Sequence, residues 1–312
     1  MRWVKASVRW LAALLVLLAL LVAVYAWRSL PTMDGELQLP GLRGPVKVQR
    51  DTADVTHILA SDPRDAWMAM GYVHAQERGW QLEMNRRLMR GRLSEVFGKT
   101  TLETDLLMRT LGIRQAAQAQ LAGADEESRQ ALKAYSAGVN AFFAHRNQAL
   151  SPEFQILRID PREEAAAGQY WEPEDSAGWA LMMALDLGGN WGNELARLSA
   201  LQVLDTPALW QLFPPYPGEA PAASADLAAL YRQLGVFRNG TTVSSTPIQD
   251  PQTDRLAQGI REWVDTLGHV DSKGSNNWVV AGERSASGKP LLANDPHLGL
   301  SAPAIWYFAH LQ

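Results

Sequence analysis

The sequence predicts an α+β protein in which a mostly helical region is followed by strands. Apolar residues recur at helical spacing in several stretches between residues 62 and 204, which is the pattern of amphipathic helices. From residue 275 onward the pattern changes to short apolar runs around a turn-rich loop, which is typical of a β-hairpin. The chain has 312 residues and is 47% hydrophobic, so it can bury a sizeable core, and its length suggests about two domains.

The composition excludes several classes of function. The formal net charge is −4, so the chain has no basic excess that would indicate a nucleic-acid partner. It contains no cysteine and therefore has no disulfide framework, thiol nucleophile or thiolate metal site. The lack of cysteine fits any cellular compartment.

The N-terminal segment, residues 1–28, predicts export. An unbroken apolar run extends from Trp10 to Trp27, and as a helix its residues would span ~27 Å, close to the ~30 Å of a hydrocarbon core. Basic residues should stay on the cytoplasmic side, and three of them precede the run: Arg2, Lys5 and Arg9. We expect a periplasmic protein. Small residues at Val24–Ala26 also suit a signal peptidase, so cleaved signal peptide and retained inner-membrane anchor both remain open.

The next stretch predicts strands and then a long helix. Residues 36–60 alternate weakly between apolar and polar, so we expect short strands there. Asp62–Pro63 begins a helical pattern that breaks near Gly79. His74 lies on this helix, and we interpret it as a packed residue without chemistry. The charged residues of the helix recur at helical spacing and predict a solvated or paired face; they are Glu83, Arg86, Arg87 and Arg90.

Further helices are predicted at 125–146, 174–187 and 193–204, with a short one at 207–212. Residues 236–274 are polar and have the composition of a linker. After them, two strands at 278–281 and 290–293 flank the turn-rich loop 285–289 and form a hairpin. Ser275 stands at the leading end of its first strand. A last strand is predicted at 304–309.

The bond between Gly274 and Ser275 is the main candidate for chemistry. Glycine offers an unhindered carbonyl and reaches backbone angles that other residues resist, so the serine hydroxyl could attack it and cut the chain. The new N-terminus would hold a hydroxyl beside an α-amine that titrates near pH ~8 and can act as its base. A Gly-Ser pair also occurs in ordinary turns, and the dipeptide alone would be interpreted that way.

The surrounding sequence resembles a known family. The run Ser275–Leu311, beginning SNNWVVAGE, is similar to the start of the β-subunit in the penicillin acylase family of N-terminal-nucleophile hydrolases, which includes cephalosporin and acyl-homoserine lactone acylases. The blocks Gly71–Arg78 (GYVHAQER), continuing to Gly98, and Trp171–Ser176 (WEPEDS) resemble its α-subunit. The similarity covers about residues 35–312 in the family's order.

The resemblance implies the four-layer αββα N-terminal-nucleophile hydrolase fold, with a mostly helical α-subunit. It implies α and β subunits cut from one precursor: residues 35–235 as the α-subunit, 236–274 as an excised spacer and 275–312 as the start of the β-subunit. We therefore expect that the β-subunit continues past Gln312.

The function implied is an exported, self-processing acylase that cleaves a linear amide of a small molecule through an ester on Ser275. Candidate substrates are β-lactam side-chain amides and N-acyl homoserine lactones, which would give roles in antibiotic metabolism or quorum quenching. One alternative is an acylase for N-acyl amino acids or peptides. Another is an inactive membrane-anchored binding protein that kept the fold.

The resemblance also implies roles for individual residues. His297 falls where some members carry a histidine near the nucleophile's amine, and a turn-capping histidine is the alternative. Asn276 and Asn277 offer amides beside the nucleophile or simply begin the strand. Ala184 and Gly188 fall where relatives place bulky side chains over the acyl group, and Leu298 would line the same pocket. The small size of Ala184 and Gly188, together with His297, favours a longer fatty-acyl or dicarboxylic group over phenylacetyl.

Calcium is implied as a structural cofactor. Glu194 aligns with the α-subunit glutamate that binds calcium in the family. Calcium takes six to eight oxygens, so the other ligands would come from the β-subunit past Gln312. A surface Glu–Arg pair on a helix is the alternative.

Overall fold

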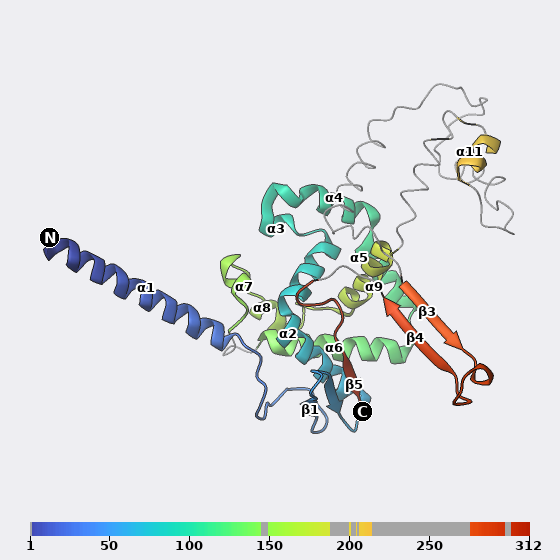
Figure 1. Ribbon diagram of the computed structural model, residues 1–312, viewed down its shortest axis with the longest axis horizontal. Coiled ribbons are helices and arrows are strands. Elements are labelled where there is room, and N and C mark those ends of the chain that lie inside the picture. The colour runs from blue at the N-terminus through green and yellow to red at the C-terminus, as the bar shows by residue number, and fades with distance from the viewer. Residues whose placement is uncertain are drawn as a thin grey trace. The chain divides into compact units, whose positions relative to one another are not determined.

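The computed structural model describes residues 2–144, 149–187, 206–213, 275–296 and 301–312, together with Ala200 and Leu204. They belong to two compact units, and Figure 1 draws their helices and strands as ribbons. The first contains Met1–Met183 and Leu300–Gln312, and the second contains Ala184–Gly299. Each unit is described by itself below.

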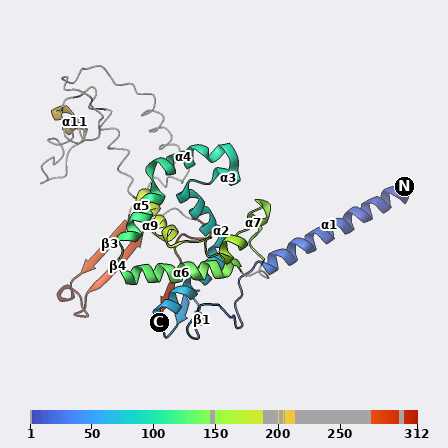
Figure 2. The same cartoon turned by 180° about the vertical axis from the view of Figure 1, so that it is seen from behind.

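The first unit begins with a long exposed helix, α1 (Arg2–Arg28). Its segment Arg9–Arg28 is apolar and long enough to cross a membrane, and none of that stretch is buried within the protein. Tyr25, near its end, is partly buried. Figure 2 shows from behind that α1 extends away from the helices that follow it.

A three-stranded sheet follows, in the order β1-β2-β5. Strand β1 (Lys47–Arg50) pairs antiparallel with β2 (Thr56–Leu59), and β5 (Ala309–Leu311) pairs parallel with β2. Strands were predicted at 36–60 and 304–309, but the second prediction is largely wrong. Since β2 begins at Thr56, whose partner is Ala309, the residues before Ala309 have no strand beside them.

Helix α2 (Pro63–Arg90) begins and ends with the residues that local chemistry favours. The side chain of Asp62 accepts a backbone N–H in the first turn, and Gly91 ends the helix at φ 61°, a left-handed conformation that glycine adopts without a Cβ clash. The helix kinks at Arg78 (φ −125°, ψ 21°), one residue before the break predicted at Gly79.

Helix α6 (Glu126–Ala144) crosses α2 at two glycines. A Cβ atom added to Gly138 would lie 2.8 Å from the Tyr72 nitrogen and closer still to a backbone oxygen of α2. A Cβ on Gly71 would lie 2.9 Å from the Tyr135 carbonyl carbon. Real Cβ atoms essentially never show such distances, so this crossing requires glycine on both helices.

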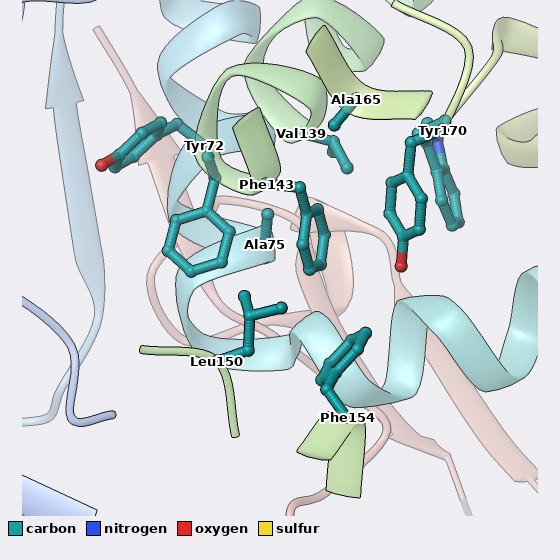
Figure 3. Close-up of a cluster of buried hydrophobic side chains, with 10 residues drawn as sticks. Tyr72, Ala75, Val139, Phe143, Leu150, Phe154, Ala165 and Tyr170 are labelled. Atoms are coloured by element: carbon teal, nitrogen blue, oxygen red, sulfur yellow. The ribbon is translucent and has the colours of Figure 1, made fainter. Parts of the chain in front are cut away.

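The aromatic core lies around α2 and α6 (Figure 3). Phe143, Phe154 and Tyr170 are almost completely buried, and the ring centroids of Phe143 and Tyr170 are 4.4 Å apart. Partly exposed side chains cover its edge, among them Leu39, which packs here and belongs to no strand. Core aromatics of this kind dominate the burial energy of a domain.

Several short helices were not predicted because they depend on tertiary contacts more than on their own periodicity. They are α3 (Ser94–Phe97), η1 (Gly98–Thr101), α4 (Leu102–Leu111), α5 (Ile113–Gly123), α7 (Pro152–Ile156) and α8 (Arg162–Ala166). For example, buried Asp105 accepts the N–H groups of Leu93 and Ser94, both at 2.8 Å, which fixes the start of α3. Isolated helices this short are unstable in water.

The remaining helices in the described residues are α9 (Pro173–Leu187), most of which belongs to the first unit, and α11 (Thr206–Leu212), which belongs to the second. Both agree with the predicted helices within a residue. The predicted helix at 193–204 and the spacer at 236–274 lie outside the described residues, apart from Ala200 and Leu204.

The second unit contains the β-hairpin. Strand β3 (Ser275–Val280) pairs antiparallel with β4 (Leu291–Pro296), and a short helix, η2 (Gly282–Arg284), lies in the connection. The hairpin was predicted, including the position of Ser275 at its leading end. Helices around α2 and α6 and separate small sheets make the described part α+β, as predicted.

Candidate active site

Ser275 is the first residue of β3, and its side chain is exposed. It pairs with Pro296, the last residue of β4. Proline has no backbone N–H and cannot donate a hydrogen bond to Ser275. Within the described residues Ser275 therefore stands at the end of the ladder, directly after the predicted cleavage bond, while the rest of β3 is held by its partner strand.

Polar residues gather at the same end of the hairpin. Asn276 pairs with Asp295, and Asn277 pairs with Asn294. Directly paired residues share a face of the sheet and successive residues alternate. Asn277 and Asn294 therefore lie on the face of Ser275, and the other pair lies on the opposite face. Toward the turn the strands are apolar and exposed, with Trp278, Val279, Leu291 and Leu292.

The turn of the hairpin fixes this register. The Ser285 hydroxyl donates to backbone carbonyl oxygens across the loop, at 2.6 Å to Lys289 and 3.1 Å to Gly282. A Cβ atom on Gly282 would lie 2.5 Å from the carbonyl oxygen of Gly288, so the two ends of the loop approach closely. A slip of one residue would move every side chain to the other face, and the loop opposes such a slip.

The other predicted site residues are placed only in part. Ala184 lies in the last turn of α9 and is exposed. Gly274, His297, Leu298, Gly188 and Glu194 lie outside the described residues. Among the residues that the structure describes, no group of three or more His, Asp or Glu side chains is placed to hold a metal ion.

The charged residues of α2 form a buried network that the sequence indicated only in part. Glu83 is completely buried and accepts hydrogen bonds from Arg86 (3.0 Å), Arg87 and the Tyr170 hydroxyl (2.7 Å). Burial alone would raise the pKa of Glu83, but the two guanidinium groups and the hydroxyl outweigh it and hold the pKa below its usual value. The guanidinium of Arg86 also stacks 4.2 Å from the ring centre of Tyr170.

The next arginine along α2 continues this network. Arg90 donates two hydrogen bonds to the buried Asp175, at 2.7 and 2.6 Å. Asp175 also accepts the backbone N–H of Glu172 (2.8 Å), so it caps α9 from inside its first turn. The charged face of α2 is thus paired, as one of the two predictions stated, and the solvated alternative is wrong. Pairing satisfies charges that would otherwise be costly to bury.

His74 packs between two tyrosines, in agreement with its interpretation as a packed residue. Its Nδ1 lies 2.9 Å from the Tyr135 hydroxyl, and its ring meets Tyr307 edge-on with centroids 4.5 Å apart. Burial, with a smaller contribution from Arg78, lowers the pKa of His74 to about 4. The imidazole is therefore neutral at physiological pH.

Tyr307 belongs to the segment after the predicted cleavage bond. Its hydroxyl lies 2.8 Å from the Thr56 hydroxyl, and the Arg78 guanidinium lies 5.8 Å from its ring centre. No sequence pattern indicated this cluster, because its members are far apart along the chain.

Comparisons with known proteins show which family these features belong to. The sequence profile described as penicillin amidase matches residues 45–312. The chain is 35% identical over 295 residues to "Penicillin acylase 2 proenzyme" of Pseudomonas sp. (strain SE83), covering 91% of this chain and 34% of that protein. It is 33% identical over 287 residues to "Acyl-homoserine lactone acylase QuiP" of Pseudomonas aeruginosa, covering 91% and 31%.

Among solved structures, a penicillin G acylase from Alcaligenes faecalis is similar, with 22% identity and a TM-score of 0.42 over 66% of this chain and 98% of that one. The chain spans about a third of the length of the curated relatives that it matches. The family profile nevertheless covers most of the chain, including the helical region and the hairpin with Ser275. The chain therefore belongs to the penicillin amidase family.

Proposed function

We propose that this chain is part of an exported, self-processing amide hydrolase whose nucleophile is Ser275. The observation that carries the proposal is the position of this serine. It follows a glycine, begins a strand and stands exposed where the strand ladder ends. A nucleophile at such a position is held by the sheet yet accessible to a substrate. The word "proenzyme" in the name of one relative also supports processing.

Maturation would begin with attack of the Ser275 Oγ on the Gly274 carbonyl carbon. The hydroxyl proton passes to the serine nitrogen, the C–N bond breaks, and the chain is joined through an ester. Water then hydrolyses the ester, which leaves a carboxylate on Gly274 and restores the hydroxyl of Ser275 beside a free α-amine.

In turnover the α-amine accepts the Oγ proton as the hydroxyl attacks the substrate carbonyl. The proton then passes to the leaving amine, which departs and leaves the acyl group as an ester on Ser275. Water attacks this ester and releases the acid. Asn277, on the same face of the hairpin as Ser275, would supply a side-chain amide near the reacting atoms, whereas Asn276 lies on the opposite face. His297, which follows the strand partner of Ser275 in sequence, would tune the proton affinity of the amine.

The substrate we propose is a linear amide of the kind named for the relatives: the side chain of a β-lactam or an N-acyl homoserine lactone. Ala184, Gly188 and Leu298 would line the acyl pocket. The first two are small and would leave room for a longer acyl chain.

We further propose that the protein is exported to the periplasm and that α1 stays as its anchor in the inner membrane. Two features support an anchor over a cleaved signal peptide. The helix continues to Arg28, past the small residues that a signal peptidase would use. The Tyr25 hydroxyl also donates a hydrogen bond to the Leu150 carbonyl oxygen (2.6 Å), and cleavage after Ala26 would remove this contact.

Calcium remains a proposal as a structural ion. Glu194 could supply at most two of the six to eight oxygens that calcium takes, so the ion would need further ligands from elsewhere in the protein. When bound, it would stabilise the fold and take no part in the proton transfers at Ser275.

The test is processing of the full-length protein, followed by intact mass and N-terminal sequencing. The unmodified protein should give a new N-terminus at Ser275 without added protease, while Ser275→Ala should stay uncut and inactive. Ser275→Cys should still be cut, because a thiol can make the same shift. Ser287→Ala, in the exposed hairpin loop, is the matched control and should mature normally.

A Ser275→Ala protein that is cut at the same bond and hydrolyses amides would show that the nucleophile is another residue. A mature protein that cleaves N-acyl amino acids, but neither β-lactam side chains nor acyl-homoserine lactones, would contradict the proposed substrate class. An unmodified protein that stays uncut and inactive would favour a binding function.

A further inference from the structure

The end of the predicted membrane helix is fastened to the folded part of the first unit at two places. The Tyr25 hydroxyl bonds to the carbonyl oxygen of Leu150 at 2.6 Å. A few residues later, the Gln76 amide donates to the carbonyl oxygen of Thr32 at 3.0 Å. Gln76 lies on α2, in the centre of the fold. The helix is thus joined directly to the folded part, with no free linker between them.

This attachment determines how near the fold lies to a membrane. Tyr25 is three residues before Arg28, a distance of about 4.5 Å along the helix axis. It therefore lies in the last turn of the apolar span. Tyrosines at such positions sit at the level of the lipid headgroups. The Leu150 carbonyl, which contacts its hydroxyl, must lie at nearly the same depth.

The chain that follows Leu150 must then lie at the membrane surface. Helix α7 has five residues and a length of only about 7.5 Å. In both views it lies beside the end of α1 (Figures 1 and 2). The headgroup region on each side of a bilayer is about 5–8 Å thick, so a short helix attached at this depth cannot avoid it.

The side chains of this region suit such a surface. Within α7, Phe154 is buried in the core while Ile156 is 75% exposed. Leu30 and Met33, just after α1, are each 60% exposed, and Trp27 is 73% exposed. These side chains belong to the two segments that the Tyr25–Leu150 hydrogen bond joins, and exposed apolar patches mark contact sites.

The charges of this region indicate what kind of contact it is. Residues 149–157 carry one charged side chain, that of Glu153, and contain no Lys or Arg. Attraction to anionic lipids needs a cluster of basic residues. Insertion of apolar side chains is therefore the source of affinity, and the contact should depend little on salt.

We propose that residues 149–157, with Leu30 and Met33, form a membrane-contact surface that rests on the outer face of the bilayer crossed by α1. The partner is the lipid headgroup layer, into which Ile156 inserts. This inference rests on the proposed retention of α1 as an anchor. It means that the folded unit is held against the membrane at one orientation.

These 312 residues contain no cysteine, so site-specific labelling gives a direct experiment once any cysteine elsewhere in the full-length protein is replaced by serine. Three variants of the full-length protein each carry one cysteine, at Ile156, Leu15 or Leu106, labelled with an environment-sensitive fluorophore. Each variant is reconstituted in phosphatidylethanolamine–phosphatidylglycerol vesicles that contain spin-labelled lipids as quenchers. Leu15 lies within α1 and reports the anchor. Leu106, on α4, is an exposed leucine (50%) farther from α1 than α7 is (Figure 1), and it is the matched control.

The expected result is strong quenching at Leu15 by deep spin labels and at least threefold more quenching at Ile156 than at Leu106 by shallow ones. Tyr25→Phe removes only the hydroxyl and should lower the quenching at Ile156 without changing that at Leu15. Quenching at Leu15 with equal signals at Ile156 and Leu106 would overturn the inference and leave the anchor intact. Cleavage that removes Leu15 from the protein would overturn both the membrane-contact surface and the proposed anchor.

Discussion

Replacing Gly138 with alanine should strongly destabilise the first unit, although alanine is the better helix former. Gly138 faces α2 at the crossing of the two central helices. Its added Cβ would lie 2.9 Å from the Met68 carbonyl carbon and 2.8 Å from the Tyr72 nitrogen, and closer still to the Met68 oxygen. All three atoms are backbone, so no side chain can rotate away to make room.

The cost follows from these distances. A carbon–oxygen contact ordinarily lies at about 3.3–3.6 Å, so α2 and α6 must separate by about 1.5 Å. A gap of about 0.5–1 Å already forfeits a quarter to a half of each dispersion contact, and overpacking of a core typically costs about 1–3 kcal/mol. Because the clash is with rigid backbone, we expect about 3 kcal/mol. The gain in helix propensity, about 1 kcal/mol, offsets only part of it.

Thermal unfolding followed by circular dichroism at 222 nm measures this effect. A loss of about 3 kcal/mol should lower the midpoint by about 6–12 °C in a domain of this size. Gly123→Ala is the matched control, because a Cβ there meets nothing within 4 Å, and its midpoint should stay or rise slightly. Gly71→Ala together with Gly138→Ala should cost less than the sum, since one helix separation relieves both clashes. An unchanged midpoint for Gly138→Ala would refute the close crossing.

Two further predictions concern buried polar groups. Asp175→Asn should lower the free energy of unfolding by about 3–5 kcal/mol because it breaks a buried pair with Arg90. Asp160→Asn, at an exposed pair, should lower it by less than about 1 kcal/mol. Equal urea midpoints for the two variants would contradict this prediction. The pKa of His74 is about 4 in the folded protein, against an ordinary value of 6.5 that applies to the unfolded chain. As pH falls from 6.5 toward 4, the unfolded chain takes up a proton before the folded protein does, and stability is lost. His74→Gln should make the melting temperature depend less on pH between these values. If the melting temperature of this variant falls as steeply with pH as that of the unmodified protein, another group causes the loss of stability.

Local sequence determined the hairpin and the long helices. Asp62 before Pro63 and Gly91 after Arg90 satisfy the ends of α2 with groups adjacent in the chain, so these boundaries can be predicted from short-range chemistry. The turn residues around Gly282 and Ser285 likewise fix the register that sets Ser275 opposite Pro296. The candidate nucleophile could be found from the sequence because the Gly274–Ser275 pair and the family motif that follows it are contiguous.

Other features could not be predicted because their partners are distant in sequence. Tyr170 bonds to Glu83 across 87 positions, and the Tyr307 hydroxyl meets Thr56 across 251. Charges at helical spacing predicted only a solvated or paired face, and burial decided between the two. The extent of the last strand also depended on where β2 begins.

The sequence by itself therefore determined the family, the α+β class, the apolar N-terminal helix and the position of Ser275. Each of these rests on neighbouring residues or on a contiguous motif. Only the tertiary structure decided that the charges of α2 are buried in pairs, that two glycines let α2 and α6 cross closely, and that Tyr25 joins the apolar helix to Leu150. Those features arise from contacts between distant segments, whose geometry is fixed when the core closes and not by any local pattern.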